Sequence, residues 1–119
     1  MRAFGLMLVL AMTAWSATAA AEIVVSMQAL DKVTARVSAF TAPIGKPVRF
    51  GTLEIVARAC QKRPPEETPE SAAFLEIREL RFGEQPKALF SGWMFASSPA
   101  LNPLQHPVYD VWIKDCVNS

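Results

Sequence analysis

The stretch Leu53-Glu54-Ile55-Val56-Ala57-Arg58-Ala59-Cys60 decides the fold class of this chain. Leucine, isoleucine and two alanines occupy every second position, and Glu54, Arg58 and Cys60 lie between them. A period of two is typical of a strand with one face against a core. We therefore expect a half-buried strand at 53–60, with Cys60 near its end on the face opposite the apolar set.

Similar extended patterns lie on both sides of this stretch. They cover residues 32–40, 47–50, 72–80, 87–95 and 108–116. In 32–40, Val33, Ala35, Val37 and Ala39 form the apolar face and predict a second half-buried strand. Residues 72–80 partly fit a helical period, but their short length and β-rich surroundings favour a strand. Residues 87–95 are apolar on both faces, which predicts a central strand.

Proline and glycine mark the connections between these segments. The sequence predicts a turn at 43–46, a bulge or tight bend at Gly51-Thr52 and a hairpin-like turn at 82–86. Residues 61–71 form the longest polar segment and 97–107 hold three prolines, so both are expected to be irregular and exposed. We predict an all-β fold, a small antiparallel sandwich or partly open barrel of five to seven short strands.

The N-terminus indicates export. A basic start at Arg2 precedes an apolar run over 3–15 and small residues over 16–21, the order of a secretory signal peptide. The run is shorter than the roughly 20 residues that a transmembrane helix needs. We therefore expect a signal peptide at 1–21, cleaved before Glu22, and a single β-rich domain at 22–119 with no transmembrane segment. Basic and acidic residues balance once Arg2 is removed, which argues against nucleic acid as a partner.

Cys60 and Cys116 are the two cysteines. In an exported chain they predict a disulfide bond, since oxidising compartments form and keep such bonds. Lys62 and Lys114 each lie two residues from a cysteine. A basic neighbour can lower the pKa of a thiol, so a thiol-disulfide protein is the alternative.

His106 is the single histidine and the centre of the enzymatic alternative, a small hydrolase. That hypothesis pairs it with Asp110 or Asp115 and with a serine, Ser97 or Ser98. No nucleophile motif surrounds those serines. One histidine with two paired cysteines makes no zinc site, and no glycine-rich phosphate loop is present, so no metal or cofactor is predicted.

Aromatic side chains gather in the last third of the chain. Trp112 falls on the same strand face as Asp110 and Lys114, opposite Tyr109. Most aromatic residues of a small domain belong to its core, but those left on a polar face mark contact surfaces. The candidate binding surface comprises Trp93, Trp112, Tyr109 and His106.

Five segments resemble the family known as domain of unknown function 2155. They are Leu30–Arg36, Val48–Ile55, Ala59–Glu66, Phe90–Leu101 and His106–Trp112, and the resemblance covers about residues 29–116. It implies a small exported protein of Gram-negative cells, hence a periplasmic location, with cysteines at the positions of Cys60 and Cys116. It implies no activity, ligand or catalytic residue. Because the residues form no catalytic constellation and the last third is rich in aromatic residues and prolines, the leading hypothesis is a non-catalytic periplasmic module that binds an envelope protein or a cell-wall component.

Overall fold

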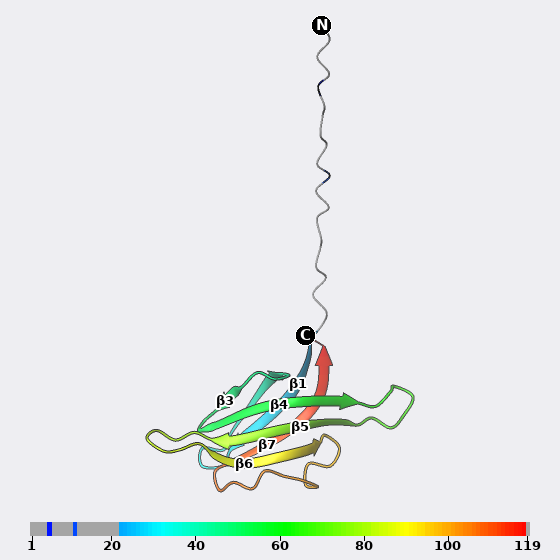
Figure 1. The fold of residues 1–119 in the computed structure, drawn as a ribbon. Coiled ribbons are helices and arrows are strands. Elements are labelled where there is room, and N and C mark those ends of the chain that lie inside the picture. Colours follow the sequence, from blue (N-terminus) through cyan, green and yellow to red (C-terminus); the bar gives the residue numbers. More distant parts are fainter. Residues whose placement is uncertain (1–4, 6–10, 12–21, 119) are drawn as a thin grey trace.

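Two antiparallel sheets face each other in the computed structural model, which describes residues 5, 11 and 22–118 (Figure 1). One sheet has the order β2-β1-β7, from β1 (Ile23–Asp31), β2 (Arg36–Pro43) and β7 (Tyr109–Asn118). The other has the order β3-β4-β5-β6, from β3 (Val48–Phe50), β4 (Leu53–Lys62), β5 (Ser71–Glu79) and β6 (Lys87–Phe95). The prediction of an all-β fold is confirmed, as an open sandwich. Apart from residues 5 and 11, the predicted signal peptide lies outside the described residues.

The core lies between the sheets, where every second side chain of the inner strands meets the opposite layer. The largest fully buried side chains are those of Met27, Leu53, Ile55, Leu75, Ile77 and Val25. Burying one such side chain contributes about 1.5–3 kcal/mol, so this layer is the main source of stability. The alternation in 53–57 and in 109–113 was therefore a correct guide to the core face.

The prediction for residues 32–40 is partly wrong. Residues 32–35 form a turn, in which the Asp31 Oδ1 atom accepts hydrogen bonds from the backbone N–H groups of Val33 and Thr34. The strand β2 starts at Arg36 and presents Phe40 and Ala42 to the core side, whereas Val37 is 58% exposed. Its inner face is set by pairing with β1, where Phe40 lies opposite the buried Met27.

The prediction that 87–95 is a central strand is also wrong. This segment forms β6, which lies at one edge of its sheet. The irregular segment after it covers this edge, because the Asn102 Nδ2 atom donates a hydrogen bond to the Trp93 carbonyl oxygen at 2.9 Å. The edge of β6 is thus covered by a loop and not by a further strand.

Two β-bulges determine where the cysteines point. In β4 the register jumps across Arg58, so that Ala57 pairs with Leu75 and Cys60 pairs with Ala73. Leu75 and Ala73 are both buried, which places Cys60 on the core side and not on the opposite face as expected. In β7 the register jumps across Lys114 in the same way and turns Cys116 inward. Each bulge adds one residue and reverses the alternation after it.

Candidate functional site

Cys60 and Cys116 form a disulfide bond that joins the two sheets, in agreement with the sequence. Their Cα atoms lie 5.8 Å apart, within the usual range for such a bond. Cys116 is 9% exposed, and Cys60 is partly buried against the core. A largely covered bridge between two core layers fits a structural role better than an exchange reaction, which needs access to a sulfur atom.

Asp115 organises the polar groups beside the disulfide. Its carboxylate accepts hydrogen bonds from the Ser71 hydroxyl at 3.0 Å and from the Cys116 backbone N–H at 2.8 Å. It also pairs with the Lys62 ammonium at 3.0 Å. Burial alone would raise the pKa of Asp115, but the bonds from Lys62, Ser71 and the Cys116 N–H together lower it. The two lysines near the cysteines thus have defined places in the fold. Lys62 pairs with Asp115, and Lys114 is the extra residue of the β7 bulge.

His106 occupies the other end of the sandwich, and its side chain is only 4% exposed. Its Nδ1 atom accepts hydrogen bonds from the backbone N–H groups of Val108 and Tyr109, at 3.0 and 3.1 Å. The proton of the neutral ring therefore lies on Nε2, which donates to the Glu79 carboxylate at 2.7 Å. The ring links the end of β5 to the start of β7 and so connects the two sheets.

Glu79 is the buried anion of this cluster. Besides His106, its carboxylate binds the Arg81 guanidinium. The hydrogen bond from His106 and the bond and charge of Arg81 lower the pKa of Glu79, against the opposing effect of burial. The Lys32 ammonium donates to the backbone carbonyl oxygen of His106 at 2.9 Å and pairs with Asp110 at 3.1 Å.

These contacts separate His106 from the partners that the hydrolase hypothesis needs. Asp110 is paired with Lys32, Asp115 lies at the disulfide end, and Ser97 hydrogen-bonds to Glu70. The bond from the Ser97 side chain is the main cause of a lowered pKa of Glu70. Both ring nitrogens of His106 are occupied by bonds within the fold. The geometry therefore gives the hydrolase hypothesis no support.

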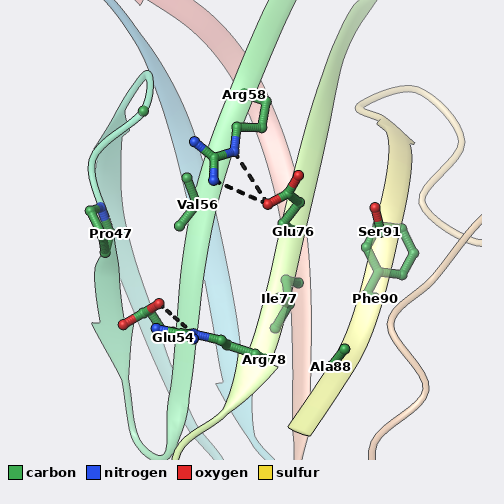
Figure 2. A pocket seen from close by; sticks show the side chains of 11 residues that line it. Pro47, Glu54, Val56, Arg58, Glu76, Ile77, Arg78, Ala88, Phe90 and Ser91 are labelled. Atoms are coloured by element: carbon green, nitrogen blue, oxygen red, sulfur yellow. Dashed lines mark hydrogen bonds and ion pairs between the residues drawn. The ribbon is translucent and has the colours of Figure 1, made fainter. Parts of the chain in front are cut away.

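A groove of about 450 Å³ crosses the outer face of the four-stranded sheet (Figure 2). Pro47 lines one side and β6 the other, with Phe90 and Ser91. Along its floor, Val56 lies between two cross-strand ion pairs. Arg58 pairs with Glu76 at 3.2 Å, and Arg78 pairs with Glu54 at 2.7 Å.

The charges of this groove are balanced and mostly accessible. The side chains of Arg58, Arg78 and Glu76 are 52, 50 and 46% exposed. Exposed ion pairs contribute little to the free energy of unfolding. Their guanidinium and carboxylate groups can therefore bind a ligand instead of each other with little loss of stability. The sequence places Glu54 and Arg58 on a polar face but does not reveal the groove, since alternation within one strand does not show which strands lie beside it.

Aromatic side chains extend the same outer face beyond the groove. Trp93 lies opposite Phe74 in the β5–β6 register, and their rings meet edge to face with centroids 5.6 Å apart. Both alternate with buried residues, Phe74 between Ala73 and Leu75, and Trp93 just before Met94. Their rings therefore stand on the outer side, next to Ser91 at the rim of the groove.

The four residues of the predicted binding surface are not brought together. Trp93 lies on the outer face of the four-stranded sheet, whereas Trp112 lies opposite Gln28 on the outer face of the three-stranded sheet. Tyr109 is half-buried between the sheets, where its ring packs against Phe50 and His106. His106 is interior, so of the four only Trp93 adjoins the groove.

The described residues contain neither a metal site nor a membrane-crossing helix. Within that part of the chain, no group of three or more histidine, cysteine, aspartate or glutamate residues is placed to hold a metal ion. Nor does any helix there have the length and apolar character to cross a membrane.

Comparison with known proteins identifies a family and leaves the activity open. The chain is 33% identical over 88 residues to an uncharacterized protein of Rickettsia prowazekii (strain Madrid E). That alignment covers 74% of this chain but only 57% of the relative, so the chain spans little more than half of that protein's length. No solved structure matches this chain. Residues 25–116 match the family described as uncharacterized protein conserved in bacteria, domain of unknown function 2155, and the chain therefore belongs to it.

Proposed function

We propose that this chain is an exported, non-catalytic module of the periplasm that binds an envelope protein or a cell-wall component. The observation that carries the proposal is the outer face of the four-stranded sheet, where the groove adjoins the Phe74–Trp93 ring pair. The outer face of a solvated antiparallel sheet is normally polar. A hollow with exposed guanidinium and carboxylate groups beside aromatic rings suits a ligand with both polar and apolar parts.

Two further observations support export. The first 21 residues have the order of a signal peptide, and the fold is closed at one end by a disulfide bond. Fractionation of cells that express the full chain tests this part. We expect a periplasmic protein whose mass corresponds to a start at Glu22 and whose two cysteines resist alkylation before reduction. Recovery in the cytoplasm with two free thiols would contradict export.

The two tryptophans provide a matched pair for the binding test. Trp93→Ala alters the proposed surface, whereas Trp112→Ala removes an equivalent ring from the opposite outer face. Each variant is incubated with isolated cell-wall sacculi and, separately, with a solubilised envelope extract. We expect Trp93→Ala to lose at least tenfold in bound fraction and Trp112→Ala to bind as wild type, with both folded by circular dichroism.

Arg58→Ala tests the groove itself. This side chain is 52% exposed and pairs only across the surface, so its loss is expected to leave stability within about 1 kcal/mol of wild type. Reduced binding to sacculi alone would identify a cell-wall component, and reduced capture from the extract alone would identify an envelope protein. Unchanged binding of both Trp93→Ala and Arg58→Ala would show that this face is not the binding site.

A further inference from the structure

Four strand edges border the two sheets, and three of them carry features that block pairing with another strand. β3 is only three residues long. β6 has an extra residue, Leu89, in its register with β5 and receives the hydrogen bond from Asn102. β7 contains the bulge at Lys114. Short edges, bulges, charged residues and covering loops are the devices by which proteins prevent edge-to-edge association.

The edge of β7 is also satisfied by side chains. The imidazole of His106 accepts from the Tyr109 N–H, and the Asp115 carboxylate accepts from the Cys116 N–H. These two bonds occupy donors near both ends of the strand. A further strand could not add along β7 without displacing them.

β2 is neither short nor bulged, and it carries only two features that hinder pairing, Arg36 at its first position and Pro43 at its last. It pairs with β1 over eight residues without a register shift, and no strand of the described residues pairs with its other side. Arg36 is its single charged residue, at the first position. Every second residue of an edge strand directs its N–H and C=O groups away from the sheet. An edge of this length whose residues 37–42 carry neither charge nor proline is therefore a template for a further strand.

We propose that a second copy of this chain binds along β2, so that the two three-stranded sheets join into one sheet of six strands. The strand is compatible with itself. With the two-fold axis at Ala39, the two Ala39 residues face each other and Val37 faces Thr41 of the second copy. Arg36 then faces Ala42, and the two arginines stand roughly 20 Å apart, since a strand rises about 3.4 Å per residue.

The outer face of β2 gives this pairing an apolar contribution. Val37 is 58% exposed and lies opposite Leu30 of β1, so the two side chains form a stripe that ends at the free edge. In the proposed register Val37 packs beside Thr41 of the second copy, which covers part of the Val37 side chain. The inference rests on the edge alone and does not depend on the proposed binding face.

Sedimentation of the protein purified after expression of the full chain tests this inference. We expect the mass to double with rising concentration. Ala39→Lys should remain monomeric, because two ammonium groups would face each other across the axis. Ala88→Lys on β6 is the control, since Ala88 is also exposed and lies on an edge of the other sheet. It should dimerise as wild type does.

Hydrogen exchange locates the interface in the same samples. The amides of residues 36–42 should exchange more slowly as concentration rises in wild type and in Ala88→Lys, and not in Ala39→Lys. The inference is overturned if wild type stays monomeric at every concentration. It is also overturned if folded Ala39→Lys dimerises like wild type, or if the slowed amides lie on another strand.

Discussion

The two ends of the sandwich are closed by different chemistry. At one end a disulfide joins β4 to β7, with Asp115, Lys62 and Ser71 beside it. At the other end His106 joins β5 to β7 through hydrogen bonds to Glu79 and to two backbone N–H groups. The covalent link acts mainly by restricting the unfolded chain. The hydrogen-bonded link acts in the folded state, because each buried polar group needs its partner.

Because the two links act differently, removing them should destabilise the fold in different ways. Loss of the disulfide removes a constraint but leaves a well-packed interface between the sheets. Loss of the imidazole leaves buried donors and a buried carboxylate without partners, and the penalty is local. The following substitutions separate these two modes.

Replacing both cysteines with serine should have the largest effect. The bond closes a sequence separation of 56 residues, for which the chain-entropy estimate is a loss of about 4 kcal/mol. Urea unfolding of the double variant and of wild type measures the difference in unfolding free energy. A loss below about 1 kcal/mol would show that the denatured chain is restricted by other means.

His106→Ala should cost about 3 kcal/mol, since it leaves the Glu79 carboxylate and two N–H donors of β7 without their partner. Glu79→Gln is the comparison, because an amide oxygen can still accept from the His106 Nε2–H. We expect Glu79→Gln to lose less than half as much in urea unfolding. Equal losses would mean that the charge of Glu79, and not the hydrogen bonding of the ring, holds this end together.

Gly51→Ala should destabilise the histidine end by about 2 kcal/mol. The backbone of Gly51 has a φ of 56°, and an added Cβ would collide with the Tyr109 hydroxyl. Gly83 has a similar φ of 77° and open space around it, so Gly83→Ala should show only the backbone strain of about 1 kcal/mol. The difference in melting temperature between Gly51→Ala and Gly83→Ala measures the effect of the contact with Tyr109. Identical melting temperatures would show that this ring moves aside freely.

Lowering the pH should reduce the unfolding free energy more through the histidine end than through the disulfide end. The expected loss is smaller than the losses caused by the substitutions above. Glu79 and Asp115 both have a lowered pKa in the fold, so their contribution to stability is present above their ordinary values of 4.5 and 3.8. It is lost as pH falls further, because the unfolded state then binds more protons. The Glu79 side chain is 8% exposed against 37% for Asp115, whose interactions are therefore more strongly screened.

The unfolding free energy, measured from pH 6 down to pH 3, distinguishes the two carboxylates. Glu79→Gln should flatten this pH profile more than Asp115→Asn does. If Asp115→Asn flattened the profile more than Glu79→Gln, the assignment of the buried anion to the histidine end would be contradicted.

The sequence predicted the positions of strands more reliably than which side chains of each strand point to the core. Alternation located β4 and β7, short length and β-rich surroundings favoured a strand at β5, and prolines and glycines located the turns between them. The bulges at Arg58 and Lys114 were not visible, because an inserted residue changes no composition and appears only in the register with the neighbouring strand. That is why the disulfide was predicted while the face of Cys60 was wrong.

The candidate site was less accessible to prediction for the same reason. The groove needs Glu54 and Arg78, from strands separated by the 63–70 loop, to pair across the sheet. The partner of His106 lies 27 residues earlier in the chain. Nothing in Glu79 itself distinguishes it from the exposed glutamates. Such pairings depend on strand order, which the sequence of a single chain does not specify.

Native-state hydrogen exchange before and after reduction of the disulfide tests the contrast between the two ends most directly. The account predicts that reduction speeds exchange in residues 58–62 and 113–118, while the amides of Val108 and Tyr109 stay protected by His106. Equal acceleration at both ends would contradict it, because the two links would then act as one cooperative unit.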